Sequence, residues 1–184
     1  VVDNSVDEFT MHFGSRIDIT VLEDTVSVRD YGRGIPLGKV VECVSVINTG
    51  AKYDSESFQF SVGLNGVGTK AVNALSSAFL VRSYREGKYV EAEFERGVLK
   101  RKKEGKAPEE KGGTFISFHP DPQIFPDFHY LDDIIEERLW SYAYLNTGLT
   151  ITYNKMLIKS QNGLLDLLSK KLGSEGLYPT LHFK

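Results

Sequence analysis

The sequence predicts an α+β domain, a two-layer sandwich in which helices cover one face of a mixed, mostly antiparallel sheet. Several segments alternate polar with apolar residues, short turns join most of them, and segments with helical spacing stand before, between and after them. Strands joined by short turns pair antiparallel, because a parallel pair needs a long crossover. With 184 residues, 41% hydrophobic and 26% charged, the chain has the size and composition of one globular domain.

A helix is expected at the start of the chain. Its apolar residues Val2, Val6, Phe9 and Phe13 recur at offsets of four, three and four. This spacing places them on one helical face as far as about Gly14. Because the sequence begins inside this apparent helix and ends in an apparent strand, we expect it to be a piece of a longer protein.

The other expected elements follow in chain order. Alternation predicts strands at residues 16–21, 25–30, 79–84, 89–95, 98–102, 114–118 and 150–153. Helical spacing predicts helices at residues 40–47, 69–77, 131–144 and 163–172, the last with Asn162 as its N-cap and Gly173 as its C-terminal stop. Between Tyr31 and Gly68 the sequence is rich in glycine and reads mostly as loop, which is typical of a functional segment.

Bulk properties exclude several classes of protein. The single Cys43 cannot form an internal disulfide, and neither a signal peptide nor an apolar run long enough for a membrane span is visible, which predicts a cytoplasmic protein without membrane contact. A net charge of -3 gives little attraction for nucleic acid, so any DNA contact is expected elsewhere. The basic run from Lys100 to Lys103, with Lys106, is interpreted as a solvated hairpin tip.

The stretch from Asp30 to Pro36 carries the most information about function. It places a carboxylate at a strand end, followed by Gly32 and Gly34. Glycines let a ligand approach the backbone closely, and an isolated carboxylate beside them can accept a hydrogen bond from an exocyclic amine such as that of adenine. The alternative is that Asp30 only closes its own turn.

A second glycine-rich stretch, Gly63 to Gly68, leads directly into the helix expected from Thr69. Such a loop presents backbone N–H groups to phosphate. The spacing resembles a Walker A loop, but Thr69-Lys70 stands where that motif needs Lys followed by Ser or Thr, which moves the lysine off the phosphates. A dinucleotide-binding motif also fits the letters, yet that fold needs parallel strands with helical crossovers.

Asn4 and Glu8 lie one helical turn apart on the first predicted helix. The amide oxygen of Asn4 is a suitable ligand for Mg²⁺, which typically takes one or two protein oxygens besides phosphate and water. The alternative is an ordinary amphipathic helix with its polar residues facing outward.

Taken in order, these segments resemble the GHKL ATPases. The motifs are VVDNSVDE at the start, DYGRGIP from Asp30, TGAKY from Thr49, GLNGVG from Gly63, VNALS from Val72, and Gly113-Thr114. The chain is most similar to the B subunits of DNA gyrase and topoisomerase IV, from Val1 to at least Gly148. The resemblance implies a Bergerat-type fold and an ATP-binding domain over residues 1–184, whose last residues approach a transducer domain. Histidine kinases and heat-shock chaperones of the same superfamily are the alternative.

The resemblance also implies roles for individual residues. Asn4 would bind Mg²⁺, and Asp30 with Thr114 would read the adenine edge of ATP. Arg33 would pair with Glu8, and Arg85 matches the arginine against which aminocoumarin inhibitors lie. The remaining contacts expected with ATP are Gly34, Ile35, Pro36, Lys52 from a mobile lid, Ile116, and the phosphate loop Gly63, Leu64, Asn65, Gly66, Val67, Gly68 and Thr69.

Some family features stand outside this sequence. The general base of the family is a glutamate four residues before the Mg²⁺-binding asparagine, which falls just ahead of Val1, and the N-terminal arm and the transducer lysine are also absent. We therefore expect these residues alone to be monomeric, to bind nucleotide weakly and to hydrolyse none. The connection between Pro36 and Gly50 is shorter than in the gyrase pattern, and Asn65 stands where many members have His.

The expected parent is an ATP-hydrolysing DNA topoisomerase. Its partners would be a second B subunit, which dimerises on ATP binding, the A subunit, and DNA held by the whole enzyme. ATP hydrolysis would drive the passage of one duplex through another, and competitive inhibitors would occupy the ATP site.

Overall fold

The computed structural model describes residues 1–46 and 66–173. The elements in chain order are α1 (Val2–Thr10), β1 (Arg16–Leu22), β2 (Thr25–Asp30), the 3-10 helix η1 (Leu37–Lys39), α2 (Val40–Ser45), α3 (Gly68–Ala74), β3 (Ser76–Arg85), β4 (Lys88–Glu95), β5 (Val98–Lys106), β6 (Gly113–Pro120), α4 (Asp132–Leu145), β7 (Thr150–Tyr153), β8 (Met156–Ile158) and α5 (Leu164–Leu172).

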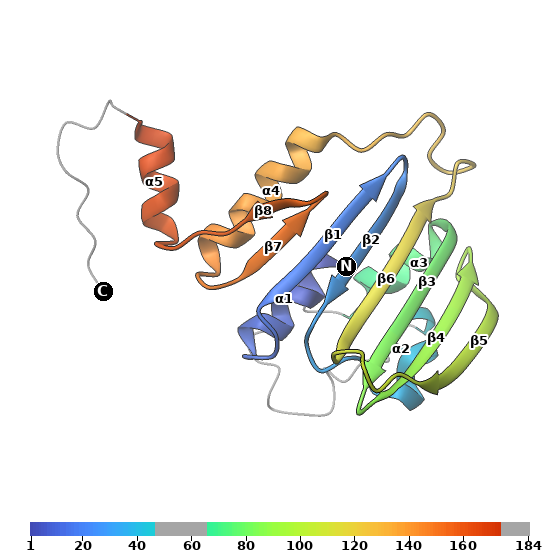
Figure 1. Cartoon of the computed structure of the whole chain (residues 1–184). Coiled ribbons are helices and arrows are strands. Elements are labelled where there is room, and N and C mark those ends of the chain that lie inside the picture. The colour runs from blue at the N-terminus through green and yellow to red at the C-terminus, as the bar shows by residue number, and fades with distance from the viewer. Residues whose placement is uncertain (47–65, 174–184) are drawn as a thin grey trace.

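The strands form one eight-stranded sheet in the order β5-β4-β3-β6-β2-β1-β7-β8. β1 and β7 run parallel, and the other neighbouring strands run antiparallel. Helices α1 to α4 lie on one face of this sheet, while α5 packs against α4 beyond the β8 edge (Figure 1). The predicted class, helices on one face of a mixed and mostly antiparallel sheet, is confirmed.

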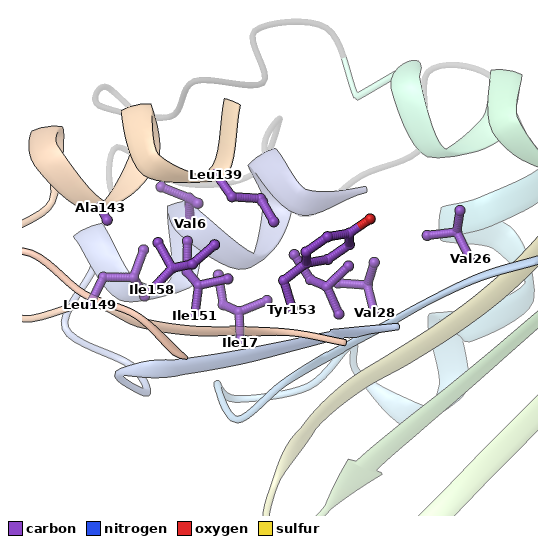
Figure 2. Close-up of a cluster of buried hydrophobic side chains, with 11 residues drawn as sticks. Val6, Ile17, Val26, Val28, Leu139, Ala143, Leu149, Ile151, Tyr153 and Ile158 are labelled. Carbon is purple, nitrogen blue, oxygen red and sulfur yellow. The ribbon is translucent and has the colours of Figure 1, made fainter. Parts of the chain in front are cut away.

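One hydrophobic core lies between α1, α4 and the β2-β1-β7-β8 half of the sheet (Figure 2). Along β1 and β2 alternate residues are buried, which follows from the period of two in a strand with one covered face. The buried members are Val6, Ile17, Ile19, Val26, Val28, Leu139, Ala143, Leu149, Ile151, Tyr153 and Ile158. This core fixes α1 against the strand that ends at Asp30.

A second core fills the space between α2 and the β4-β3-β6 half of the sheet. Its buried members are Val40, Val44, Phe79, Val81, Val90, Ala92, Phe94 and Ile116. Phe118 is half-buried and packs against both cores, so the two are continuous under the centre of the sheet. The functional residues described below lie at the end of this double core where β2 stops and β6 begins.

Several predicted boundaries were wrong. α1 ends at Thr10 instead of Gly14, because Met11, His12 and Phe13 donate their backbone N–H groups back to the last turn and His12 adopts a φ of 66°. α3 stops at Ala74, and the residues after it open β3 because the carbonyl of Leu75 accepts a hydrogen bond from the backbone of Asp121. The short strand β8 was not expected.

The basic run near residue 100 is not a hairpin tip. Its residues lie on β5, the edge strand of the sheet, which extends to Lys106. Glutamates of β4 face them across the strand pair: Arg101 contacts Glu93, Lys103 lies 4.0 Å from Glu91 and Lys100 lies 3.1 Å from Glu95. Cross-strand charge pairs of this kind support a solvated edge strand, and this strand continues beyond the predicted end at residue 102 through the expected hairpin tip.

Asn162 is not the N-cap of the last helix. The cap position is Gly163, with a φ of 62°, and α5 begins at Leu164. The carboxylate of Asp166, in the first turn, accepts hydrogen bonds from the backbone N–H groups of Gln161 and Asn162, both at 3.0 Å. The predicted C-terminal stop at Gly173 is confirmed.

Candidate functional site

Asp30 ends β2 with its side chain turned toward the helices. Its side chain is buried, and Oδ1 accepts hydrogen bonds from the backbone N–H of Gly32 at 3.0 Å and of Thr114 at 3.1 Å. Oδ2 accepts a longer bond, 3.4 Å, from the hydroxyl of Ser5 on α1. One oxygen thus closes the turn and ties it to β6, and the other faces α1.

The protonation of Asp30 reflects this burial. Desolvation raises the pKa of the Asp30 carboxyl above its ordinary value, with a further contribution from the charge of Glu8. The hydrogen bonds from Gly32 and Thr114 and the nearby Arg29 act in the opposite direction. Among the described residues, the second oxygen of this buried carboxylate accepts one long hydrogen bond, so it is well suited to accept another from a ligand.

The glycines after Asp30 pack too closely for any side chain. Gly34 has a φ of 75°, and a Cβ on it would lie 2.6 Å from the carbonyl oxygen of Tyr84 on β3. A Cβ on Gly32 would lie 2.6 Å from Oε2 of Glu8. The loop from residue 31 to 36 therefore runs in direct contact with α1 on one side and with β3 on the other.

Glu8 and Arg33 form the ion pair that the resemblance implied. Glu8 accepts hydrogen bonds from the backbone N–H of Arg33 at 2.8 Å, from Nε at 3.2 Å and from Nη2 at 2.8 Å. The Arg33 guanidinium also lies 4.2 Å from the ring centroid of Phe13, and its pKa is raised, chiefly by the hydrogen bond to Glu8. This pair fixes the loop to the last turns of α1.

Past the ion pair, the loop leads to β3. Ser83 donates a hydrogen bond of 2.7 Å to the carbonyl of Ile35, and Ser83 stands opposite Thr114 in the β3–β6 ladder. Pro36 then leads into η1. Ser83 thus fixes Ile35 beside Thr114 and completes one wall of the site.

The start of α3 lies beside Asn4. Nδ2 of Asn4 donates to Oγ1 of Thr69 at 2.7 Å, which joins the first turn of α1 to the first turn of α3. Lys70 is buried and its Nζ donates to the carbonyl of Gly66 at 2.7 Å. The Lys70 side chain therefore folds back and contacts Gly66, in the described part of the glycine loop.

Several predicted site residues have a less direct placement. Ile116 is 6% exposed and belongs to the second core, so its side chain lies mostly beneath the site. Arg85 ends β3 next to Tyr84, is partly exposed, and has Glu86 3.5 Å away. Four predicted contacts lie outside the described residues: Lys52, Gly63, Leu64 and Asn65.

Sequence reasoning missed Ser5, Ser83 and Arg29. Ser5 is adjacent to Asn4, but its contact with Asp30 depends on how α1 packs on the sheet, for which the sequence holds no local signal. Ser83 could have been found only from the register between β3 and β6. Arg29 precedes Asp30 and, by strand alternation, points to the opposite face of the sheet.

A shallow cavity of about 470 Å³ lies beside the loop and does not include the residues around Asp30. It is lined by Leu37 and Gly38 of η1 and by β4 and β5 residues including Tyr89 and Lys102. The cavity is not lined by Asp30 or Thr114, whose hydrogen bond joins β2 to β6. We therefore place the candidate functional site at the loop of residues 31 to 36.

The donor set fits a cation held jointly by protein and phosphate. Among the described residues, no three His, Cys, Asp or Glu side chains gather closely enough to form a metal site of their own. The hydrogen bond from Asn4 to Thr69 uses the amide nitrogen, which leaves the amide oxygen of Asn4 as the atom that can bind a cation. One neutral oxygen suits Mg²⁺ that takes its other ligands from phosphate and water.

Comparison with solved structures identifies a similar fold. No protein-family model matches the chain. The solved 43K ATPase domain of Thermus thermophilus gyrase B, in complex with an aminocoumarin, superposes with a TM-score of 0.78 at 28% identity, over 97% of this chain and 49% of that one. The match extends over nearly all of the sheet and its helices.

Comparison with curated proteins gives the same relatives. The chain is 55% identical to the B subunit of DNA topoisomerase 4 from Borreliella burgdorferi over 96% of its length, and 36% identical to the B subunit of DNA gyrase from Thermotoga maritima over 100% of it. It spans 29% and 31% of these two relatives. The chain is therefore homologous to the B subunits of topoisomerase IV and gyrase and has the fold of the gyrase B ATPase domain.

Across residues 1–46 and 66–173, no helix has the length and apolar character that crossing a bilayer requires.

Proposed function

We propose that the chain binds ATP with Mg²⁺ between α1, the loop after β2 and the start of α3, as the nucleotide-binding part of the B subunit of a type II topoisomerase. One observation carries the proposal: Asp30 is buried, its Oδ1 is held by two backbone N–H groups, and its Oδ2 has one long bond to Ser5. Homology to the B subunits of gyrase and topoisomerase IV supports it.

Each part of the site has a distinct task. Oδ2 of Asp30 accepts a hydrogen bond from the adenine amino group, and the Thr114 hydroxyl reaches the same edge through a water. The glycine loop from residue 63 to Thr69 surrounds the phosphates with backbone N–H groups. Glu8, Arg33 and Pro36 line the mouth.

Mg²⁺ binding is proposed at the amide oxygen of Asn4. When bound, the ion neutralises part of the negative charge on the phosphates. The hydrogen bond between Asn4 and Thr69 places this oxygen beside the first turn of α3, where the phosphate loop ends. Asn4 would therefore hold the ion beside the loop proposed to bind the phosphates.

The whole protein is proposed to act with partners. Nucleotide binding dimerises two B subunits, and hydrolysis drives passage of one DNA duplex through another together with the A subunit. Competitive inhibitors of the aminocoumarin class are proposed to occupy the same pocket and to lie against Arg85, the partly exposed last residue of β3. A cytoplasmic location follows from this activity on DNA.

Calorimetry with a non-hydrolysable ATP analogue and Mg²⁺ tests the proposal. Asp30→Asn should abolish binding while the free energy of unfolding stays within about 1 kcal/mol of the wild type, because an amide keeps the shape and the Oδ1 acceptor. Asp121→Asn is the matched control, since Asp121 is also buried and its carboxylate also accepts a backbone N–H, that of Gln123, but it follows the end of β6 opposite to Thr114 and pairs with Arg96. Wild-type affinity in Asp30→Asn would show that Asp30 only closes its turn.

A further inference from the structure

Arg29 is held on the outer face of the sheet, the face away from the helices. Val28 and Asp30 on either side of it are buried toward the helices, so strand alternation turns Arg29 outward. Its guanidinium lies between two aromatic rings, 4.8 Å from the centroid of Tyr31 and 4.6 Å from that of Tyr84. Two rings on a cation restrict its orientation and add cation–π attraction.

The two terminal nitrogens of this guanidinium bind two segments of the chain. Nη1 donates to the carbonyl of Asp30 and Nη2 to the carbonyl of Lys111, each at 2.6 Å. Lys111 comes shortly before the start of β6, and the last paired residues in the β2–β6 ladder are Arg29 and Phe115. Arg29 therefore connects the end of β2 to the segment entering β6 at the point where the ladder ends.

A second bridge crosses the same gap on the opposite face. There Oδ1 of Asp30 accepts from the backbone N–H of Thr114 at 3.1 Å. Between the two bridges stands Gly113, whose φ of 127° disfavours other residues and whose missing Cβ would lie 2.7 Å from Nη1 of Arg29. The separation of Asp30 and Thr114 is thus set from both faces of the sheet.

We infer that Arg29 is a positioning residue for adenine recognition, acting through the backbone of Asp30 and of the segment that carries Thr114. The inference rests on the proposed nucleotide site. Recognition of a base edge requires its hydrogen-bonding groups at fixed separations, since a displacement of a fraction of an ångström weakens each bond. Arg29 never touches the ligand, so its effect appears in the choice between bases.

Lysine cannot replace arginine in this role. A guanidinium presents several N–H donors in a rigid plane, whereas an ammonium is a point charge on a flexible stem. Both Arg29→Gln and Arg29→Lys should therefore weaken binding of a non-hydrolysable ATP analogue about tenfold, the loss expected when displacement of Asp30 or Thr114 weakens one hydrogen bond to the base. The preference over the matching guanine analogue should shrink in both variants.

Arg82→Gln is the matched control. Arg82 lies on the same outer face and donates to the Tyr84 hydroxyl at 3.0 Å, but its ion pair is with Glu91, and no hydrogen bond joins it to Asp30 or Lys111 in the described part of the chain. This variant loses stability yet should keep both the affinity and the base preference of the wild type. Thermal melts of all variants identify the fraction folded during calorimetry.

Hydrogen exchange in the full chain supplies a second measurement. The N–H of Thr114 should exchange about tenfold faster in Arg29→Gln, while that of Ile116, inside the ladder, stays unchanged. Wild-type base preference together with wild-type exchange at Thr114 would overturn the role of Arg29. A wild-type chain that binds neither nucleotide would overturn the proposed function, and the adenine role of Arg29 with it.

Discussion

Oδ1 of Asp30 lies 3.1 Å from the backbone nitrogen of Thr114, although 84 residues separate the two in the sequence. The same oxygen accepts from Gly32 at 3.0 Å. The turn-closing role that the DxGxG pattern alone suggested is therefore real, and it coexists with an oxygen left facing α1. Asp30 serves structure with one oxygen and is available for ligand recognition with the other.

The stability of the protein should carry a pH signature from Asp30. Because burial raises its folded-state pKa above the ordinary 3.8, the folded state holds this proton more tightly than the unfolded state. The contribution to stability is fully present below pH 3.8 and is lost as the pH rises through the folded pKa. The amide side chain in the variant Asp30→Asn has no such proton to lose. The free energy of unfolding of this variant, relative to that of the wild type, should therefore increase as the pH rises through the folded pKa of Asp30.

Urea titrations at a series of pH values measure the difference. The wild type and Asp30→Asn should have similar free energies of unfolding at the lowest pH values of the series. At neutral pH the free energy of unfolding of the variant should equal or exceed that of the wild type. A variant that grows less stable than the wild type as the pH rises would mean that the ionised carboxylate stabilises the fold.

Gly34 should tolerate no other residue. It combines a φ of 75° with a Cβ position 2.6 Å from the carbonyl oxygen of Tyr84, so Gly34→Ala requires both strained backbone and displacement of β3. We expect a loss of roughly 1–3 kcal/mol of unfolding free energy, together with weaker nucleotide binding. Gly38→Ala is the control, because nothing lies within 4 Å of its Cβ position. Equal stability of the two variants in chemical denaturation would contradict the close approach.

Asn4→Ala should separate metal binding from base recognition. The variant removes the amide oxygen proposed for Mg²⁺ and the hydrogen bond to Thr69, but leaves Asp30 and Thr114 in place. Affinity for an ATP analogue should therefore lose its dependence on Mg²⁺, whereas adenosine should bind as before. Calorimetry with and without Mg²⁺ gives both values. An increase in affinity on adding Mg²⁺ as large as in the wild type would place the metal on other ligands.

The fold was predictable where the pattern is local. The alternation of polar and apolar residues located most strands, because burial on one face of a sheet depends on residues close together in the sequence. The short connections predicted antiparallel pairing, because a hairpin turn also depends on adjacent residues. Boundaries failed where a distant partner decides them. The carbonyl of Leu75 accepts a bond from Asp121, 46 residues later, and this contact ends α3 where the sequence still reads as helix.

The site was predictable to the extent that its motifs are continuous in sequence. Asp30 stands in a short phrase whose chemistry can be read directly, whereas the pairing of Arg33 with Glu8 was implied by the family resemblance. Ser5 stands inside one such phrase and Arg29 directly before another, and yet the contacts of both escaped notice. Their contacts depend on the packing of α1 and on the point where the β2–β6 ladder ends, and neither property has a local signal.

Asp166 should make the last helix sensitive to acid. It accepts hydrogen bonds from Asn162, Ser160 and Gln161, which lower the pKa of its carboxyl to about 2 from the ordinary 3.8. A depressed pKa contributes stability that is present above the unfolded value and is lost as the pH falls toward the folded one. The N-terminus of α5 should therefore loosen between pH 3.8 and about 2.

Carbon chemical shifts of α5 across this range measure the effect. In Asp166→Asn the helix should be frayed already at neutral pH and should show no further change on acidification, because an amide has no proton to gain. Asn162→Ala removes a single side-chain bond of 2.9 Å to the carboxylate and keeps the two backbone bonds, so it should retain the acid transition. An acid transition in Asp166→Asn like that of the wild type would assign the sensitivity to another group.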